Sequence, residues 1–274
     1  MYSNRFLTLF VVSLVLLAGC AGGGDVAPEA ESEGTTADGD GASGGSAAGG
    51  GGSAASTDDE FELNDPEALL REAGSFTVTW SYTGVDADGV ETQVTQTFYA
   101  DLDAERSYSR ITSTTDGQPD GGTVEQFVAD GVTYIRSGTD ESASYTSYEG
   151  SVGVLATAIA FSQARAYGAD DDLTFVGSET FDGTSVDRYE LSAANEALIL
   201  AGSAAAPNSP GELDVTNFEY AVLVDEDGLS RYESWSFAGR MDDGTEVQGS
   251  WEYSLTAVGS TTVDDPDWLD EATA

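Results

Sequence analysis

From residue 76 onward, the chain repeats short runs in which apolar and polar side chains alternate, and Asp-Gly pairs separate most of these runs. The first run is the clearest, since Phe76, Val78, Trp80 and Tyr82 alternate with Thr and Ser. A period of two places the two sets of side chains on opposite faces of a β-strand. Asp-Gly accepts the positive φ angles of tight hairpins, so the pattern predicts consecutive antiparallel strands. The aspartates of these seven pairs are Asp88, Asp116, Asp120, Asp130, Asp182, Asp227 and Asp243.

One predicted helix precedes the strands, and two more helical segments interrupt them. Asn64-Asp65-Pro66 indicates a helix start, and Gly74 indicates its end. The segments Val152 to Tyr167 and Ala193 to Ala201 are apolar nearly all round, which is typical of helices buried against another layer. The remaining strands are predicted at 94–98, 124–129, 132–136, 173–180, 184–191, 215–224, 229–238 and 245–258, followed by an extended tail held by Trp268.

These elements predict a mainly β fold of the α+β type. We expect an antiparallel curved sheet, or open β-barrel, of roughly nine to eleven strands. Two or three helices should pack on its concave face, because an apolar helix needs a surface to cover it.

The N-terminus carries the one reactive group whose role the sequence indicates. After Arg5, an apolar run from Phe6 to Ala18 leads into Leu17-Ala18-Gly19-Cys20. The run is too short to span a membrane and has the length of a signal-peptide core. The motif resembles the lipoprotein signal of bacteria and haloarchaea, which implies cleavage before Cys20 and a lipid on its thiol. A plain signal peptide and an uncleaved anchor remain alternatives.

Residues 21–59 contain Gly, Ser, Ala, Thr and acidic side chains but no aromatic residue. Such a segment cannot bury enough apolar surface to fold, so we expect a disordered tether with an average span of roughly 35 Å. The predicted organisation is therefore a signal peptide at 1–19, a lipidated N-terminus and tether at 20–60, and a single domain at 61–274. The domain should lie on the extracytoplasmic face of the cell membrane.

The charge balance is extreme, with 9 basic against 50 acidic residues and a net charge of −41. All the basic residues are Arg, and Lys is absent. In molar salt the Debye length falls to about 3 Å, so self-repulsion is screened. The composition therefore indicates a halophile, while binding of cations or basic partners is the competing interpretation. A nucleic-acid partner is not expected, because no basic patch can neutralise phosphates.

The composition also removes most catalytic mechanisms. Without His there is no Ser-His-Asp triad, and without Lys there is no Schiff base or phosphate-binding lysine. A single Cys forms neither an internal disulfide nor a zinc cluster. Asp86-Ala87-Asp88-Gly89 and Asp225-Glu226-Asp227-Gly228 are similar to fragments of calcium loops, but their places between strands favour hairpin turns. We therefore predict a non-enzymatic protein with no catalytic residues, no metal site and no cofactor.

The overall pattern resembles the LolA/LppX-type lipoprotein-carrier fold, with its LppX- and LprG-like members, and haloarchaeal lipoproteins. The resemblance rests on the signal with its tether, the strand Phe76 to Tyr82, the apolar helix around Leu155 to Phe161, and the late strand pair Tyr220 to Asp225 and Gly228 to Phe237. It covers most of residues 61–274 and implies an incomplete barrel that holds acyl chains under its helices. No arginine matches the basic residues that a carrier places at its pocket mouth.

Aromatic and apolar side chains on the strands and on the central helix are therefore candidates for lining a ligand cavity. They are Trp80, Phe98, Tyr134, Leu155, Ile159, Phe175, Phe218, Trp235 and Trp251. The alternative is that they fill an ordinary core. The first hypothesis for function is a monomeric, membrane-anchored binder or carrier of a lipid-like ligand. The second is an envelope structural or protein-interaction module with a solid core, and solute capture for an importer is a weaker third.

Overall fold

The computed structural model describes residues 61–86, 88–151, 153–162, 173–191 and 213–273. Within these residues the chain forms eleven strands and three helices. The strands are β1 (Ser75–Val85), β2 (Glu91–Asp101), β3 (Arg106–Thr115), β4 (Gln118–Ala129), β5 (Val132–Gly138), β6 (Ser144–Glu149), β7 (Thr174–Phe181), β8 (Thr184–Leu191), β9 (Leu213–Asp225), β10 (Ser230–Met241) and β11 (Glu246–Thr256). The helices are α2 (Pro66–Ala73), α3 (Val154–Phe161) and α6 (Leu269–Thr273).

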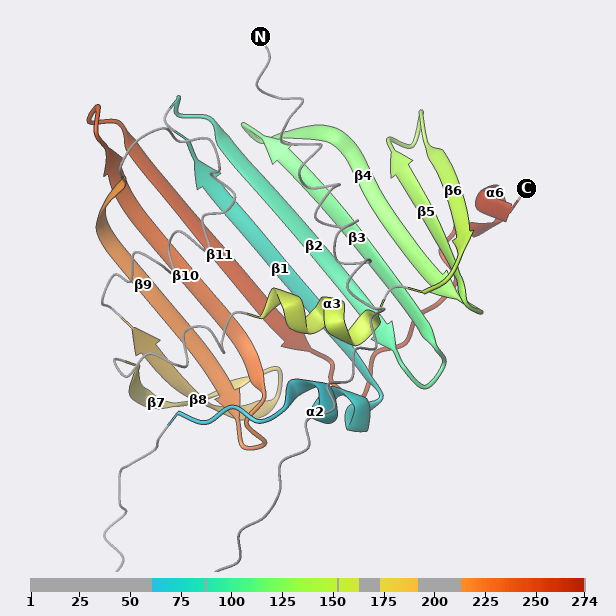
Figure 1. The fold of residues 1–274 in the computed structure, drawn as a ribbon, viewed down its shortest axis with the longest axis horizontal. Helices are drawn as coiled ribbons and strands as arrows, with labels where there is room; N and C mark the ends of the chain where they lie inside the picture. The colour runs from blue at the N-terminus through green and yellow to red at the C-terminus, as the bar shows by residue number, and fades with distance from the viewer. Residues whose placement is uncertain (1–60, 87, 152, 163–172, 192–212, 274) are drawn as a thin grey trace, which may run out of the picture.

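All the described strands belong to one antiparallel sheet, in the order β6-β5-β4-β3-β2-β1-β11-β10-β9-β8-β7 (Figure 1). Two meanders, β1 to β6 and β7 to β11, are joined where β1 pairs with β11. The sheet is curved and does not close, because β6 and β7 form its two edges. The predicted fold class is confirmed, because strands joined by short turns pair with their sequence neighbours in the antiparallel sense.

Six of the seven Asp-Gly pairs form hairpin turns as predicted. At Asp116, Asp130 and Asp182 the pair is the whole connection, and each Asp has a φ between 48° and 53° with its Gly between 72° and 79°. Positive φ at both positions is the geometry that matches the twist of the flanking strands. The pair at Asp120 is the exception: it lies inside β4, next to an irregular register between Thr112 and Thr114 of β3.

The two segments with a resemblance to calcium loops also form hairpin turns. The Asp86 carboxylate accepts hydrogen bonds from the backbone amides of Asp88 and Val90. The Asp225 carboxylate accepts in the same way from the amides of Asp227 and Leu229. These aspartates therefore hold their own turns together, as Asp commonly does in short loops.

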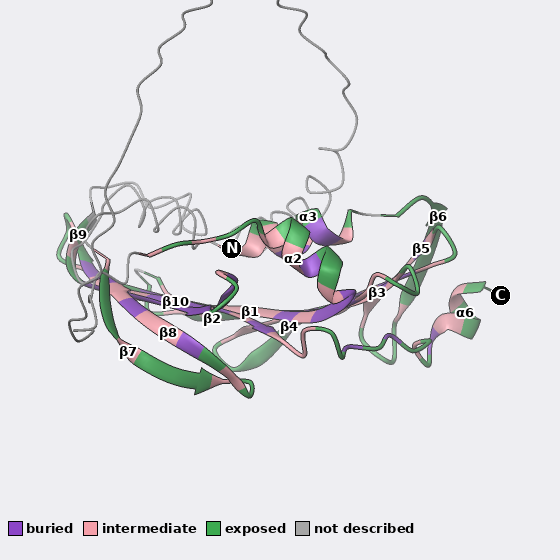
Figure 2. Cartoon of the chain, turned by 90° about the horizontal axis from the view of Figure 1, so that it is seen from below, coloured by how far each residue is buried: buried purple, intermediate pink, exposed green. Residues whose placement is uncertain are grey.

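Helices α2 and α3 cover one face of the sheet, which we call the inner face (Figure 2). Helix α2 follows its sequence signals, because Asp65 caps its first turn and Gly74 ends it with φ 74°. Helix α3 lies on the connection between the edge strands β6 and β7, so the chain crosses the inner face there. It ends at Phe161, because Ser162 has an extended backbone. The predicted continuation to Tyr167 and the helix at 193–201 lie outside the described residues.

The C-terminal segment 257–273 runs along the opposite, outer face (Figure 2). The hydroxyls of Thr77 and Thr261 are 2.9 Å apart, and Arg106 pairs with Asp265. Trp268 is buried there against Phe127. The predicted attachment through Trp268 is confirmed, although the tail ends in the short helix α6 rather than in an extended chain.

One buried ion pair ties the sheet together near this segment. The Arg231 guanidinium donates to Asp225 (3.2 Å) and to the Leu255 carbonyl (3.1 Å), and both charged side chains are at most 7% exposed. The contacts connect the β9–β10 hairpin to the end of β11. Losing one partner of such a pair leaves the other charge buried without compensation.

We expect Asp225→Asn to lower the free energy of unfolding by about 3 kcal/mol, because the buried Arg231 would keep only the more distant and partly exposed Asp182, at 3.8 Å, as a counterion. Chemical denaturation in molar salt measures this. Glu246→Gln is the matched control, because Glu246 pairs with Arg240 in the open, at 81% and 57% exposure. It should change stability by less than about 1 kcal/mol. Equal losses in both variants would contradict the interpretation.

We expect Trp268→Ala to cost about 3 kcal/mol and to free the C-terminal segment, since a large side chain is lost from the outer-face cluster. Limited proteolysis should then cut within residues 257–273 before the sheet unfolds. The control is Tyr148→Ala, which truncates a 44% exposed ring on edge strand β6 and should leave both stability and cleavage unchanged. Protection of the tail in the Trp268 variant would show that other contacts suffice.

Candidate functional site

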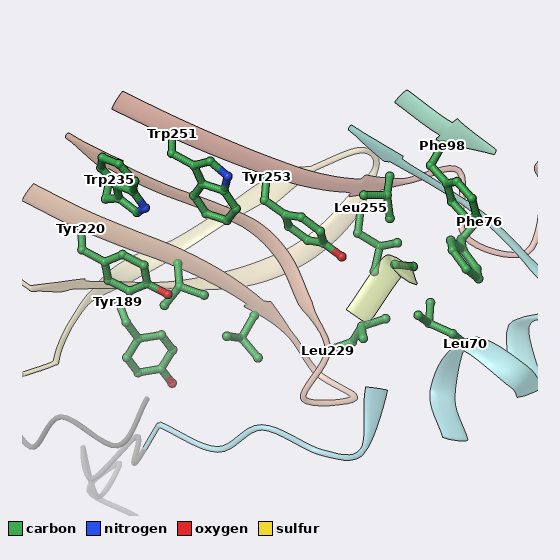
Figure 3. Close-up of a cluster of buried hydrophobic side chains, with 14 of the residues drawn as sticks. Leu70, Phe76, Phe98, Tyr189, Tyr220, Leu229, Trp235, Trp251, Tyr253 and Leu255 are labelled. Atoms are coloured by element: carbon green, nitrogen blue, oxygen red, sulfur yellow. The ribbon is translucent and has the colours of Figure 1, made fainter. Parts of the chain in front are cut away.

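The inner face carries the largest continuous apolar surface of the described residues. Cross-strand pairing places Tyr82, Trp251, Trp235 and Tyr220 in one row over β1, β11, β10 and β9. The rings of Trp235 and Trp251 are stacked at 6.4 Å, and Tyr82 lies 6.3 Å from Trp235. Figure 3 shows how the aromatic side chains of β9, β10 and β11 point to the same side of the sheet. The row forms an aromatic floor, because neighbouring residues on one face of a sheet contact each other.

A second row, beside the first, contains the polar groups of this surface. Trp80 pairs with Tyr253, Tyr253 with Glu233, and Glu233 with Val222. The Trp80 indole donates to Gln96 on β2 at 3.1 Å. Glu233 is therefore a carboxylate in the middle of an otherwise mostly apolar face.

Glu233 is fully buried, at 0% exposure. Its Oε1 accepts hydrogen bonds from the Ser230 hydroxyl at 2.8 Å and from the Ser162 hydroxyl. Ser162 is the residue that follows α3, so this carboxylate connects the end of the helix to the sheet. Burial, and then the charge of Glu233, raise the pKa of the Tyr253 phenol well above its usual value. Tyr253 therefore stays a neutral hydroxyl.

Helix α3 forms a small cover over this surface. It has eight residues, no charged side chain and no side-chain cap at its N-terminus. Two of its own side chains, Leu155 and Ala158, are buried, and the ring of Phe161 lies 5.3 Å from the ring of Trp80. Within the described residues, α3 is attached by apolar packing against the sheet and α2, and by the hydrogen bond from Ser162 to Glu233.

Many side chains of the inner face are almost fully buried. Tyr253 and Trp235 are only 2% and 4% exposed. Two hollows of about 360 and 310 Å³ lie on the outer face, where the small side chains of Ser236, Ala238 and Ser250 leave space between longer neighbours. A ligand on the inner face would therefore have to displace part of what covers it.

Seven of the nine predicted cavity residues lie together on the inner face. They are Trp80, Phe98, Leu155, Ile159, Phe218, Trp235 and Trp251. Phe175 lies on edge strand β7, 38% exposed, with its ring 5.7 Å from Tyr189 at the rim of the same cluster. Cys20 lies outside the described residues.

Tyr134 is a correction, because it does not share this surface. It pairs with Phe127 in the register of β4 and β5, and their rings are 6.2 Å apart on the outer face, where they pack near Trp268. The alternation of β5 decides this: Thr133 and Ile135 point to the inner side, so Tyr134 points away. Aromatic character alone could not reveal the face.

Glu233 is the residue that sequence reasoning missed. The signal was present, because Glu233, Trp235 and Phe237 occupy alternate positions of one strand and must share a face. An acidic side chain in phase with two aromatic ones is unusual for a buried face. Tyr82, which was recognised as part of the first strand, also belongs to the floor.

The described residues contain no group of three or more metal-ligating side chains placed to hold an ion. Within the same residues, no helix has both the length and the apolar composition needed to cross a membrane.

Several solved structures are similar to this chain at low sequence identity. LprF from Mycobacterium bovis is 11% identical, with a TM-score of 0.36, and the match covers 74% of this chain and 96% of LprF. The lipoprotein LppX from Mycobacterium tuberculosis is 15% identical, with a TM-score of 0.32, covering 74% and 100%. A LolA superfamily protein from Nitrosomonas europaea is 12% identical, with a TM-score of 0.22, covering 74% and 96%.

No curated protein matches the sequence. A family model does match it, over residues 5–272, which is nearly the whole chain. The chain therefore belongs to the family described as "Family of unknown function (DUF7537)".

Proposed function

We propose that this protein is a non-enzymatic, membrane-tethered binder of a lipid-like ligand on the extracytoplasmic side of a halophile's membrane. The observation that carries the proposal is the inner face itself: an aromatic floor, with a short helix without charged side chains packed beside it, where Phe161 lies against Trp80. The ligand's chain would lie along the row Tyr82, Trp251 and Trp235, beside α3. Burial of apolar chain there would contribute about 0.8 kcal/mol per methylene.

The cover supports this proposal more than the floor does. A helix that is only structural usually shows a polar face to solvent, whereas the exposed positions Ala156 and Ala160 of α3 are apolar. Among the described residues its attachment is mainly apolar, as in the ring pair Phe161–Trp80. Such a helix can be displaced at a lower free-energy cost than one anchored by charges and caps, which would make room over the floor.

The second candidate, an envelope module with a solid core, is favoured by a different observation. Many inner-face side chains are buried, and two hollows of about 360 and 310 Å³ lie on the outer face. The two candidates differ in whether an apolar chain can enter between α3 and the sheet.

Tryptophan fluorescence can decide between them, because the chain has four tryptophans. Trp80, Trp235 and Trp251 lie on the inner face, and Trp268 lies on the outer face. A monoacylglycerol brominated near the end of its chain quenches indoles by contact. We expect the lipid to quench the fluorescence of the Trp268→Phe variant, which keeps the three inner-face tryptophans. It should not quench the variant in which Trp80, Trp235 and Trp251 are all replaced by Phe, which keeps only Trp268. Native mass spectrometry of protein purified in molar salt should show a retained lipid. Equal quenching of both variants, or none, would favour the solid core.

The anchor requires its own test. We expect Cys20→Ser to abolish lipid attachment, because serine has no thiol to take the lipid, so the protein should appear in the medium or remain unprocessed. Detergent partitioning of cell fractions measures this. The control is Ser13→Ala, a small change within the predicted signal core that leaves Cys20 in place. Unchanged, detergent-dependent membrane attachment of the Cys20 variant would refute the assignment.

A further inference from the structure

The large apolar side chains that the described residues expose fall into two groups. Three of the five are tyrosines, which carry a hydroxyl. The other two, Phe175 and Val176, have no polar group, are 38% and 50% exposed, and are adjacent on edge strand β7. Residues 174–178 contain no charged side chain, in a chain with a net charge of −41. Exposed apolar side chains that gather in one place mark an interaction surface.

A β-bulge presents these two side chains. The register of β7 and β8 passes from Phe175–Tyr189 to Gly177–Arg188, so Val176 is the extra residue. A bulge bends its strand and re-aims side chains, and on an edge strand it obstructs regular pairing with a further strand. Addition of another β-strand, from a second copy or from a different protein, is therefore disfavoured at this edge.

The exposed pair lies where the predicted tether joins the domain. The ring of Phe61, the first described residue, packs edge-on against Tyr189 at 5.1 Å, and the ring of Phe175 packs against Tyr189 at 5.7 Å. Asn64 fixes this entry, because its side chain donates to a carbonyl of the β9–β10 turn at 2.8 Å. We call Phe61, Phe175 and Val176 the rim patch.

Negative charge on the strands beside the rim patch is paired. Glu179 on β7 and Glu190 on β8 both pair with Arg188, at 3.4 and 2.6 Å. A surface that enters a lipid environment must leave few unpaired charges, because their desolvation is costly. The rim patch meets this condition better than the acidic composition of the chain suggests.

We infer that the rim patch docks into the surface of the membrane that holds the N-terminal anchor, so that its partner is a lipid bilayer. This inference rests on the anchoring proposed above. The predicted tether ends at Phe61, inside the patch, so tethering keeps these side chains near the bilayer. Contact of a few apolar side chains with lipid is weak by itself. A flexible tether raises the effective concentration to roughly the millimolar range, where weak contacts are occupied.

Docking at this place would also serve the proposed ligand. Tyr189, which both phenylalanines of the rim patch contact, belongs to the apolar cluster of the inner face. The rim patch therefore lies at the border between that cluster and solvent. With the patch in the bilayer, an apolar chain could pass between membrane and inner face without crossing water.

The test places a fluorescent probe in the rim patch, and this is simple because the only Cys of the chain is Cys20. Val176→Cys is labelled with the thiol probe nitrobenzoxadiazole. The full-length protein, purified from its membrane, is reconstituted into phosphatidylcholine vesicles in molar salt. We expect the emission to shift to the blue and to be quenched by phospholipids with a nitroxide on the acyl chain, because the probe contacts hydrocarbon.

The matched control is Tyr148→Cys with the same probe. Tyr148 is 44% exposed on β6, the opposite edge of the same tethered domain. Its probe is brought near the vesicle by the same anchor but should remain in water, without a blue shift or quenching. The salt concentration is also varied, because an apolar contact survives rising salt whereas an electrostatic one weakens.

A second change tests the patch itself. Adding Phe175→Ala to the labelled Val176→Cys protein should lower the docking constant, on the order of tenfold, because burying a Phe side chain contributes at least that ratio. Tyr99→Ala truncates a ring of similar exposure, 36%, on β2 and should leave the docking constant unchanged. Circular dichroism melting in the same buffer checks that the variants are folded.

The outcomes separate the docking from the anchor on which it rests. Labelling of the wild-type protein would show a free Cys20, and the inference would fail together with the anchor. With the anchor present, a probe at position 176 that stays in water, or equal quenching at positions 176 and 148, overturns the docking alone. A blue shift without vesicles that grows with protein concentration would identify a second copy as the partner and also overturn it. Quenching at position 176 only, reduced by Phe175→Ala, supports the inference.

Discussion

The pairing of β1 with β11 is the constraint on which the rest of the structure depends. It joins the first and last strands of the described sheet, residue by residue from Thr77–Thr256 to Val85–Gln248. Each meander alone would leave a long unpaired edge, and hydrogen bonding between the two converts them into one sheet of eleven described strands. The pairing also brings Trp80 and Tyr82 beside Tyr253 and Trp251, so the aromatic floor exists only because the ends of the domain meet. The chain must then cross from one edge to the other, and α3 lies on this connection, on the inner face.

The two faces of the sheet differ in the side chains that they carry. The outer face carries most arginine contacts, the apolar cluster around Trp268 and the C-terminal segment, so it stabilises the fold. The inner face is mostly apolar, and among its described residues Glu233 is a fully buried carboxylate. A buried carboxylate opposes stability unless hydrogen bonds compensate it, and the hydroxyls of Ser230 and Ser162 are among its partners here. Through Ser162, Glu233 connects the end of α3 to the sheet.

Salt affects the exposed acidic side chains and the charged groups of the inner face to different extents. Charges on the exposed surface are screened in molar salt, so they affect solubility more than specificity. Charges inside the sheet are shielded from that screening. Carboxylates on the exposed surface therefore contribute mainly to hydration, whereas a carboxylate on the inner face is in a different environment. Asp225 shows a third use, since its carboxylate holds a hairpin turn and compensates the buried Arg231.

The sequence by itself determined the strand alternation, six of the seven Asp-Gly hairpin turns, the caps of α2 and the mainly β class, because these depend on neighbouring residues and on the φ angles that Asp and Gly accept. It also indicated most of the inner-face residues, since apolar alternation is a local signal. It could not determine which face each strand presents, and so Tyr134 was assigned to the wrong side and Glu233 was overlooked. Only the tertiary structure decided those points, because the shared face follows from the registers of distant strands, above all β1 with β11. The place of Asp120 inside β4 was likewise decided by pairing across β3, which outweighs the turn preference of a single Asp-Gly pair.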